Sequence, residues 1–185
     1  SGKLGTEIQA TEIPSEKGAT TRMDRDESPR ADTTIEKLRG LPTVYGSKTV
    51  TAGNAPGLND GASAMIVMSK EKQKDLGLKP AATLLAYVNM AGDPLASPYL
   101  PALSIRKALE KAGRNLADLK RIEINEAFAV VSLYAMDKLK IDPKKVNING
   151  GGVAIGHPLG ATGARLIGTS ARTLKMKNAK YGLAT

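Results

Sequence analysis

The chain has 185 residues, 41% of them hydrophobic and 24% charged, which is typical of a globular protein with one domain or two small ones. It contains no cysteine, and this excludes disulfides, thiolate metal sites and a cysteine nucleophile within the sequence itself. The formal net charge is +9, yet aromatic residues make up only 3%. Because little is available to stack on exposed bases, we expect no nucleic-acid partner.

Membrane association is not expected either. No apolar run approaches the roughly 20 residues that a bilayer span needs, and residues 1–18 lack the basic-then-apolar pattern of a signal peptide. The positive excess falls in residues 51–185, which carry nineteen basic and ten acidic side chains. These cations are either solvated surface residues or, in part, contacts for a small polyanion such as the phosphates of a coenzyme.

Residues 1–50 are polar and punctuated by Gly and Pro, which predicts a segment that packs onto other structure. Within this segment Thr33 followed by Glu36 fits a capping box, so a short helix is expected to run through Leu38 and to end at Gly40. Beyond residue 61 the pattern changes to a regular alternation of strand and helix signals.

The second part of the chain predicts five strands and four helices in succession. The expected strands are 63–68, 83–88, 122–124, 146–148 and 181–185. The expected helices are 70–76 capped by Ser69, 103–112 closed by Gly113, 127–139, and a last one that follows the Gly-rich turn at 150–163. Strands and helices in strict succession predict an α/β fold in which helices sandwich a sheet.

The last helix carries residues with small side chains, which predicts that it is buried and closely packed. The small residues are Ala161, Gly163, Ala164 and Gly168. Its apolar face is expected to consist of Ala164, Ile167, Ala171 and Leu174, which follow one another at helical spacing.

The only histidine, His157, lies in the Gly-rich turn between a predicted strand and a predicted helix. Taken alone, a single histidine is more often structural than catalytic. Five glycines between positions 150 and 160 change that interpretation, because glycine lets a substrate approach the main chain closely. We therefore predict a catalytic role for His157.

A second candidate is Asn125, which follows the predicted strand 122–124 and precedes a helix. The simple alternative is helix capping, worth about 0.5–2 kcal/mol. However, ligands bind at the carboxyl ends of strands in open α/β sheets. Since Asn125 and His157 both follow strand ends, we expect them to converge on one crevice.

Other chemistries have weaker signals. One histidine without cysteine argues against a transition-metal site, although a carboxylate-only Mg²⁺ site stays open. No Gly-x-Ser-x-Gly elbow and no Walker A motif occurs. The turn that begins at Gly150 resembles a dinucleotide loop, but the next glycine after Gly152 is Gly156, one position too late, and no ribose-binding acid follows at the expected distance.

Three motifs, at Thr49–Ala62, Asn125–Phe128 and Val146–Gly163, stand in the order found in thiolases, and the chain resembles that family over nearly its whole length. The resemblance implies a layered α/β/α/β/α architecture, of which this chain would be an incomplete piece. Residues 1–48 would be the end of the inserted loop domain, 49–80 the end of the amino-terminal half, and 81–185 most of the carboxy-terminal half.

The resemblance also implies the roles of individual residues. In thiolases one cysteine takes the acyl group, a histidine activates that cysteine, and a second cysteine moves a proton on the substrate's α-carbon. His157 matches the activating histidine, and Asn125 matches an asparagine that completes the oxyanion hole through a water molecule. The other positions would contact substrate or CoA: Phe128 in the acyl pocket, Gly156 and Pro158 around the histidine, Arg30 near the adenine or phosphate end of CoA, and Pro56 near the pantetheine arm.

Two departures from the family pattern matter. Thiolases usually have a serine at the position of Pro56, and proline offers neither a hydroxyl nor an N–H, which puts that CoA contact in doubt. Both family cysteines would lie outside the sequence, the first upstream of Ser1 and the second a few residues beyond Thr185. We therefore expect no turnover by residues 1–185 alone.

The activity implied is that of an acyltransferase, acetyl-CoA C-acetyltransferase, which condenses two acetyl-CoA to acetoacetyl-CoA and CoA or runs the reverse thiolysis. The CoA thioester is a substrate, and no separate cofactor is expected. One alternative is a subunit of a split thiolase or a non-catalytic CoA-binding protein; another is a degradative 3-ketoacyl-CoA thiolase. The resemblance further implies a homodimer or homotetramer located in the cytoplasm, or in the mitochondrial matrix of a eukaryote.

Overall fold

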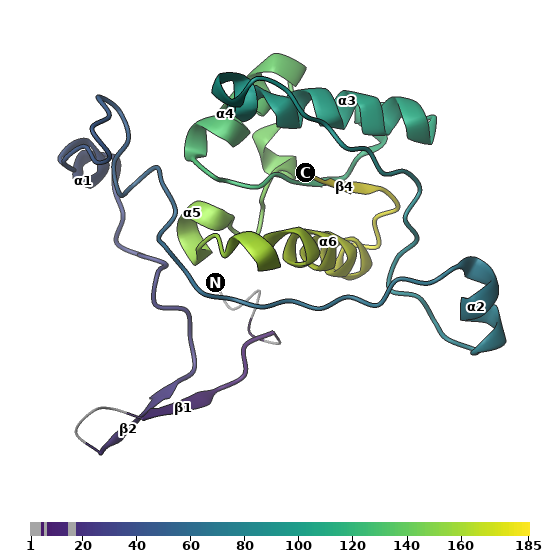
Figure 1. Ribbon diagram of the computed structural model, residues 1–185, viewed down its shortest axis with the longest axis horizontal. Coiled ribbons are helices and arrows are strands. Elements are labelled where there is room, and N and C mark those ends of the chain that lie inside the picture. The colour runs from purple at the N-terminus through teal and green to yellow at the C-terminus, as the bar shows by residue number, and fades with distance from the viewer. Residues whose placement is uncertain (1–4, 6, 15–17) are drawn as a thin grey trace.

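The structure is a computed structural model that describes residues 5, 7–14 and 18–185 (Figure 1). Six α-helices are present in this described part: α1 (Ile35–Arg39), α2 (Lys70–Asp75), α3 (Leu100–Ala112), α4 (Ala129–Leu139), α5 (Gly152–Ile155) and α6 (Leu159–Met176). The strands are β1 (Thr11–Pro14), β2 (Thr20–Met23), β3 (Arg121–Glu123) and β4 (Gly182–Ala184). Short 3-10 turns complete the set: η1 (Pro94–Tyr99), η2 (Leu116–Asp118) and η3 (Pro143–Lys145).

A compact unit forms around the parallel pair β3 and β4, in which Ile122 lies opposite Leu183. Helices α3 and α4 cover one side of this pair and α6 covers the other (Figure 1). The sequence-based prediction of an α/β fold with helices on both faces of a sheet is confirmed for this unit. The apolar core lies between β3 and the α3/α4 layer and consists of Ala102, Ile105, Leu119, Ile122, Ile124, Val131, Ala135, Ile141 and Val146.

Helix ends in this unit follow from local sequence. Helix α3 begins next to Pro101, whose missing N–H costs nothing in a first turn, and it ends at Gly113, which has the left-handed φ of 60° that favours glycine. Helix α2 is capped by Ser69, whose side chain accepts a hydrogen bond from the backbone N–H of Lys72. The predicted caps at Gly113 and Ser69 are thus confirmed.

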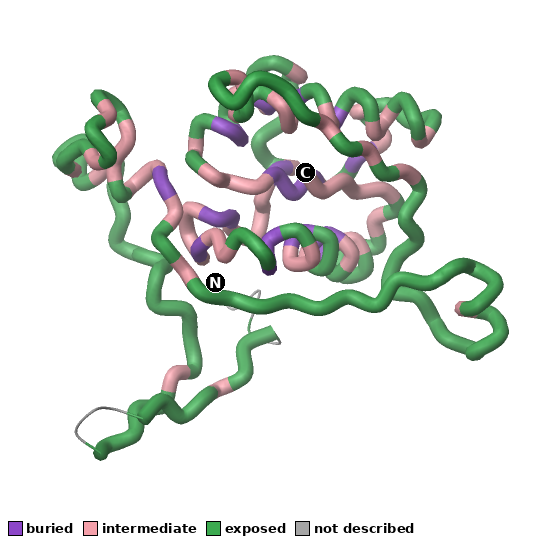
Figure 2. Tube along the Cα trace, in the orientation of Figure 1, coloured by how far each residue is buried: buried purple, intermediate pink, exposed green. Residues whose placement is uncertain are grey.

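Two predicted strands, 63–68 and 83–88, are wrong for this structure. Both segments have no strand structure, and their apolar side chains are largely exposed, including Ile66 at 86% and Leu84 at 68% (Figure 2). A strand needs a neighbour that accepts and donates its backbone hydrogen bonds. No strand of the described residues lies beside either segment, so the apolar pattern is present without the pairing.

The predicted strand 146–148 is reduced to one parallel bridge between Ile122 and Val146. The ladder ends there because Asn147 takes a left-handed backbone conformation with φ of 43°. The side chain of Asn147 makes the hydrogen bonds that a neighbouring strand would make. Its Oδ1 accepts from the N–H of Ile124 at 2.8 Å, and its Nδ2 donates to the carbonyl of Ile124 at 2.9 Å.

The predicted capping residue of α1 is off by one position. Thr34 caps the helix by accepting from the N–H of Lys37, whereas the hydroxyl of Thr33 donates to the carbonyl of Arg30. The helix ends at Gly40 as expected.

The predicted buried face of α6 is also partly wrong. The buried residues are Ala161, Thr162, Leu166, Ser170 and Thr173, whereas Ile167 is 42% exposed. An added Cβ at Gly163 or Gly168 would meet open space. The face toward β3 and β4 is therefore a mixture of apolar and hydroxyl side chains, and of the predicted residues Leu174 lies against Gly182 of β4.

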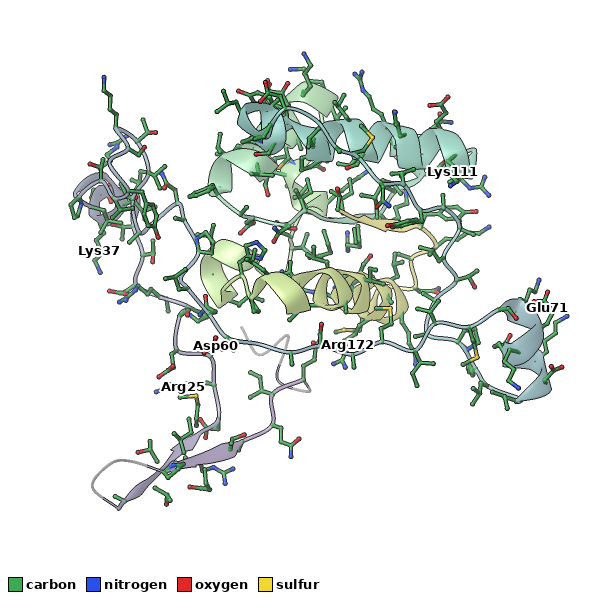
Figure 3. All side chains as sticks on the ribbon, in the orientation of Figure 1. Arg25, Lys37, Asp60, Glu71, Lys111 and Arg172 are labelled. Atoms are coloured by element: carbon green, nitrogen blue, oxygen red, sulfur yellow. The ribbon has the colours of Figure 1, made fainter. Side chains whose placement is uncertain are left out.

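The hairpin of β1 and β2 was not predicted. Thr11 to Pro14 pairs antiparallel with Thr20 to Met23, and the hairpin projects away from the compact unit (Figure 1). Arg172 of α6 reaches toward the chain near the hairpin (Figure 3) and pairs with Glu7 at 3.1 Å. A pattern of mixed polar residues carries little strand signal, which explains why the sequence did not indicate this element.

Candidate active site

The site begins at the carboxyl end of β3, where Asn125 follows the strand. Strand alternation sends Ile122 and Ile124 into the apolar core, so that Glu123 and Asn125 face the opposite layer, which is α6. The backbone N–H of Asn125 donates to the carbonyl of Thr185 at 2.7 Å. Pairing with the β4 segment therefore fixes Asn125 in place.

His157 lies two residues before α6, and its side chain meets Asn125. Nδ2 of Asn125 is 3.3 Å from Nε2 of His157. The two predicted catalytic residues, 32 positions apart in the sequence, are thus brought together by β3 and α6. Their contact is what the positions after strand ends led us to expect.

The hydrogen bonds of His157 define its tautomer. Nδ1 is 2.8 Å from Oγ1 of Thr162, and the Thr162 hydroxyl donates its one proton to the carbonyl of Pro158 at 2.8 Å. The hydroxyl can therefore only accept from the ring, which places the proton of the neutral imidazole on Nδ1. Nε2 is left as a basic nitrogen that faces the Nδ2 donor of Asn125.

The pair of His157 and Asn125 can serve two chemical roles, proton abstraction and oxyanion stabilisation. Nε2 can take a proton from an acidic group such as a thiol, as a general base does. Once protonated, Nε2–H lies beside the Nδ2–H of Asn125, and the two donors can stabilise a developing oxyanion. The sequence analysis missed Thr162 because a threonine inside a predicted helix gives no signal for a side-chain contact five positions earlier.

The loop before His157 depends on glycine. Gly156 has φ of 97° and ψ of 164°, a conformation that is essentially restricted to glycine. An added Cβ would lie 2.4 Å from the amide of Asn59. At Gly61 an added Cβ would lie 2.7 Å from Cγ of Pro158. The segment that contains Asn59 and Gly61, marked by Asp60 in Figure 3, thus packs directly against the histidine loop.

Glu126 holds the first part of the Gly-rich loop. Its carboxylate accepts from Nδ2 of Asn147 at 2.6 Å and from the backbone N–H of Val153 at 3.0 Å. An added Cβ at Gly151 would lie 2.4 Å from that carboxylate. Glu126 belongs to the motif Asn125–Phe128, and its contact with residue 153 could not be inferred from spacing.

Glu123, two residues before Asn125, is only 1% exposed. Burial raises the pKa of this carboxyl from 4.5 to about 7. The positive charge of Arg165 on α6 acts in the opposite direction, and the nearby Glu126 adds to the increase. A buried carboxyl group therefore lies in the same layer as the His157 pair.

A backbone hydrogen bond joins the chain next to Phe128 with the segment that precedes Pro56. Phe128 is the N-cap residue of α4 and is 38% exposed. The next residue, Ala129, donates its N–H to the carbonyl of Asn54 at 2.9 Å. The segment with Pro56 therefore contacts the start of α4, four residues after Asn125.

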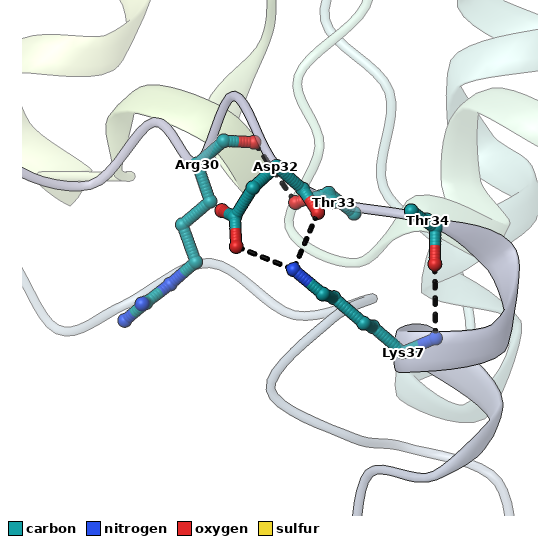
Figure 4. A network of polar contacts seen from close by, with 5 residues as sticks. All are labelled: Arg30, Asp32, Thr33, Thr34 and Lys37. Atoms are coloured by element: carbon teal, nitrogen blue, oxygen red, sulfur yellow. Dashed lines mark hydrogen bonds and ion pairs between the residues drawn. The ribbon is translucent and has the colours of Figure 1, made fainter.

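Arg30 lies away from this site, beside the start of α1 (Figure 4). The pKa of Asp32 there is below its usual range, chiefly because Lys37 donates a hydrogen bond to it, with a smaller effect of the Arg30 charge. Among the described residues, no hydrogen bond or ion pair connects Arg30 with His157. The structure therefore does not join this residue to the others predicted for the site.

No candidate metal site and no candidate membrane span is found among the described residues. Across residues 5, 7–14 and 18–185, no three or more His, Cys, Asp or Glu side chains come together in a way that could hold a metal ion. None of the helices described here has the length and apolar character to cross a membrane.

Comparison with known proteins gives two family matches. Residues 1–71 match the model described as "Thiolase, N-terminal domain", and residues 78–185 match "Thiolase, C-terminal domain". An acetyl-CoA acetyltransferase of Allochromatium vinosum is 46% identical over 185 residues, which are 100% of this chain and 47% of that protein. The chain thus spans about half the length of the curated relatives it matches.

Solved structures of related enzymes also match this chain. The Bacillus anthracis acetyl-CoA acetyltransferase matches with a TM-score of 0.89 and 42% identity over 99% of this chain and 46% of that chain. Human mitochondrial 3-ketoacyl-CoA thiolase in complex with CoA matches with a TM-score of 0.84 and 38% identity, covering 94% of this chain and 43% of that one.

Proposed function

The chain belongs to the thiolase family, and on this premise we propose that it supplies the histidine and asparagine side of a thiolase active site. The proposed reaction is the condensation of two acetyl-CoA to acetoacetyl-CoA and CoA, or the reverse thiolysis. One observation carries the proposal: Nε2 of His157 lies 3.3 Å from Nδ2 of Asn125, while Nδ1 is paired with a Thr162 hydroxyl that donates its own proton elsewhere. A base next to an amide donor can activate a thiol, and the same two groups can then bind an oxyanion.

In the direction of thiolysis, a cysteine thiol would transfer its proton to Nε2 of His157 and attack the 3-keto carbon of acetoacetyl-CoA. The bond between C2 and C3 then breaks, which leaves an acetyl-enzyme and the enolate of acetyl-CoA. The enolate takes up a proton from the second cysteine of the family mechanism. That cysteine regains a proton from the thiol of free CoA, whose sulfur then accepts the acetyl group and releases the nucleophilic cysteine. Nε2–H of His157 and the amide of Asn125, directly or through water, would stabilise the negative oxygen in these steps.

Because residues 1–185 contain no cysteine, the nucleophile in this proposal comes from polypeptide outside these residues. The division into 1–48, 49–80 and 81–185 is part of the proposal, as are the substrates acetyl-CoA, acetoacetyl-CoA and CoA. The homodimer or homotetramer and the cytoplasmic or mitochondrial location are also proposed from the family alone. Contacts of Gly156 and Pro158 with substrate are supported by their positions on either side of His157, and the place of Phe128 in the acyl pocket is proposed from the family alone.

Contacts with CoA at Arg30 and Pro56 have less support. Pro56 offers no donor, and Arg30 lies beside α1, where its charge acts on Asp32. The relatives named above are acetyl-CoA acetyltransferases and a 3-ketoacyl-CoA thiolase, so a degradative 3-ketoacyl-CoA thiolase is the second candidate.

The proposal is tested by reconstitution. Residues 1–185 are produced together with the cysteine-bearing portion of the Allochromatium vinosum relative, and cleavage of acetoacetyl-CoA by CoA is followed through loss of its enolate absorbance. We expect cleavage only with both polypeptides present, and a loss of about 10²–10³-fold with Asn125→Ala. CoA binding without any cleavage would favour a non-catalytic CoA-binding protein, and cleavage by residues 1–185 alone would refute the cysteine mechanism.

A further inference from the structure

The layer between β3 and α6 contains buried polar side chains beside the apolar Ala161 and Leu166, whereas the core on the other side of β3 is apolar. From β3 it receives Glu123 and, directly after the strand, Asn125; from the buried face of α6 it receives Thr162, Ser170 and Thr173. Buried polar residues are costly unless they are paired. Thr162 is hydrogen-bonded to His157 and to the carbonyl of Pro158, and Thr173 is hydrogen-bonded to Asn149, so the charged groups of this layer are the ones left to explain.

Two charged side chains in this layer lack direct partners. Oε2 of Glu123 and both Nε and Nη2 of Arg165 are buried, and none of these atoms has a hydrogen-bond partner in the described structure. They are complementary, since a carboxylate accepts and a guanidinium only donates. The charge of Arg165 also favours the ionised form of Glu123, which places the two groups within electrostatic reach of each other.

Glu123 and Arg165 lie next to the two residues that contact His157, namely Asn125 and Thr162. Glu123 precedes Asn125 by two residues, so both point to the same side of the strand. Arg165 follows Thr162 by three residues and so neighbours it along one side of α6. Glu123 and Arg165 therefore belong to the same contact between β3 and α6 that brings Asn125, His157 and Thr162 together.

We propose that Glu123 and Arg165 are positioning residues, whose attraction across the β3–α6 contact fixes the first turns of α6 and so holds His157 with Nδ1 on Thr162 and Nε2 toward Asn125. The catalytic meaning of this role rests on the proposed function; the structural claim does not. Buried charge pairs rarely add net stability, but they can select one packing arrangement over others. One fixed arrangement is what the His157 hydrogen bonds require.

The test uses the fact that His157 is the only histidine in the chain. A long-range ¹H–¹⁵N spectrum of ¹⁵N-labelled residues 1–185, at about pH 9 where an ordinary imidazole is neutral, reports which ring nitrogen carries the proton. For the unmodified chain we expect one dominant species with Nδ1 protonated. In Arg165→Met the population with Nε2 protonated should rise about tenfold, which corresponds to about 1.4 kcal/mol.

Three further variants make the result decisive. Arg165→Lys keeps the charge and should stay within about twofold of the unmodified populations, for a change below about 0.4 kcal/mol. Lys175→Met removes an exposed charge from the same helix and should change nothing. If Arg165→Met does not fold, the double variant Glu123→Gln/Arg165→Met leaves no unpaired charge and should fold with mixed tautomers.

An unchanged Nδ1–H species in folded Arg165→Met, or in the double variant, would overturn the positioning role. This outcome is independent of thiolase activity, because the spectrum needs neither a cysteine nor a substrate. Conversely, failure of the reconstitution assay with an intact tautomer response would reject the proposed function and leave the positioning role standing.

Discussion

The raised pKa of Glu123 predicts a specific dependence of stability on pH. The carboxyl has a pKa of about 7 in the folded chain and 4.5 as its reference value. The folded state therefore holds a proton that the unfolded state releases between these values. The contribution to stability is fully present below about pH 4.5 and is lost as the pH rises through about 7, and it amounts to about 3 kcal/mol, at about 1.4 kcal/mol for each pH unit.

Glu123→Gln mimics the protonated carboxyl and should remove this dependence. We expect the free energy of unfolding by urea, followed by circular dichroism from about pH 4.5 to about pH 8, to fall by about 3 kcal/mol more in the unmodified chain than in the variant. Glu110→Gln, which changes an exposed glutamate of α3, is the matched control and should leave the difference intact. Parallel pH profiles for the unmodified chain and Glu123→Gln would refute the argument that burial of Glu123 favours its neutral form.

Three other changes test the site. Gly156→Ala should lower the free energy of unfolding by more than about 1–3 kcal/mol, because φ is 97° and an added Cβ would clash with Asn59. The control Gly163→Ala, on the open side of α6, should instead raise it by up to about 1 kcal/mol. Equal urea midpoints for the two variants would contradict the loop geometry. In the reconstituted enzyme, His157→Ala should lower kcat by about 10²–10⁴-fold with an unchanged circular dichroism spectrum, and near-normal turnover would exclude the base role. Thr162→Val should lower kcat by about ten- to a hundredfold, whereas Thr162→Ser, which keeps the hydroxyl, should stay close to normal; equal rates would mean that the Nδ1 contact is unimportant.

Much of the candidate site could be predicted from the sequence. Asn125 follows β3, and we expected it to meet His157 because ligands bind at strand ends. The two residues do meet, although only a bridge at Val146 remains of the predicted strand and α5 lies between it and His157. The caps at Ser69 and Gly113 were also predictable, because they depend on neighbouring residues alone. The family prediction, made from three motifs, is confirmed by the matches to residues 1–71 and 78–185.

What could not be predicted depends on contacts distant in sequence. The left-handed turn at Asn147 ends a predicted strand, and its side chain takes over two backbone hydrogen bonds of Ile124. The strand pattern at 63–68 describes side chains that prefer burial, but strand formation needs a neighbouring backbone that the described residues do not provide. Similarly, periodicity identified α6 but not the whole of its buried face, because Thr162, Ser170 and Thr173 are buried there together with apolar residues.

The central claim is that His157 acts as the base on a cysteine supplied by another stretch of polypeptide. Its most direct test is the rate at which iodoacetamide alkylates that cysteine in the reconstituted protein near neutral pH, with His157 and with His157→Ala. The account predicts a rate at least about tenfold lower in the variant, because the thiol loses the base that removes its proton. Equal alkylation rates in the two proteins would contradict it.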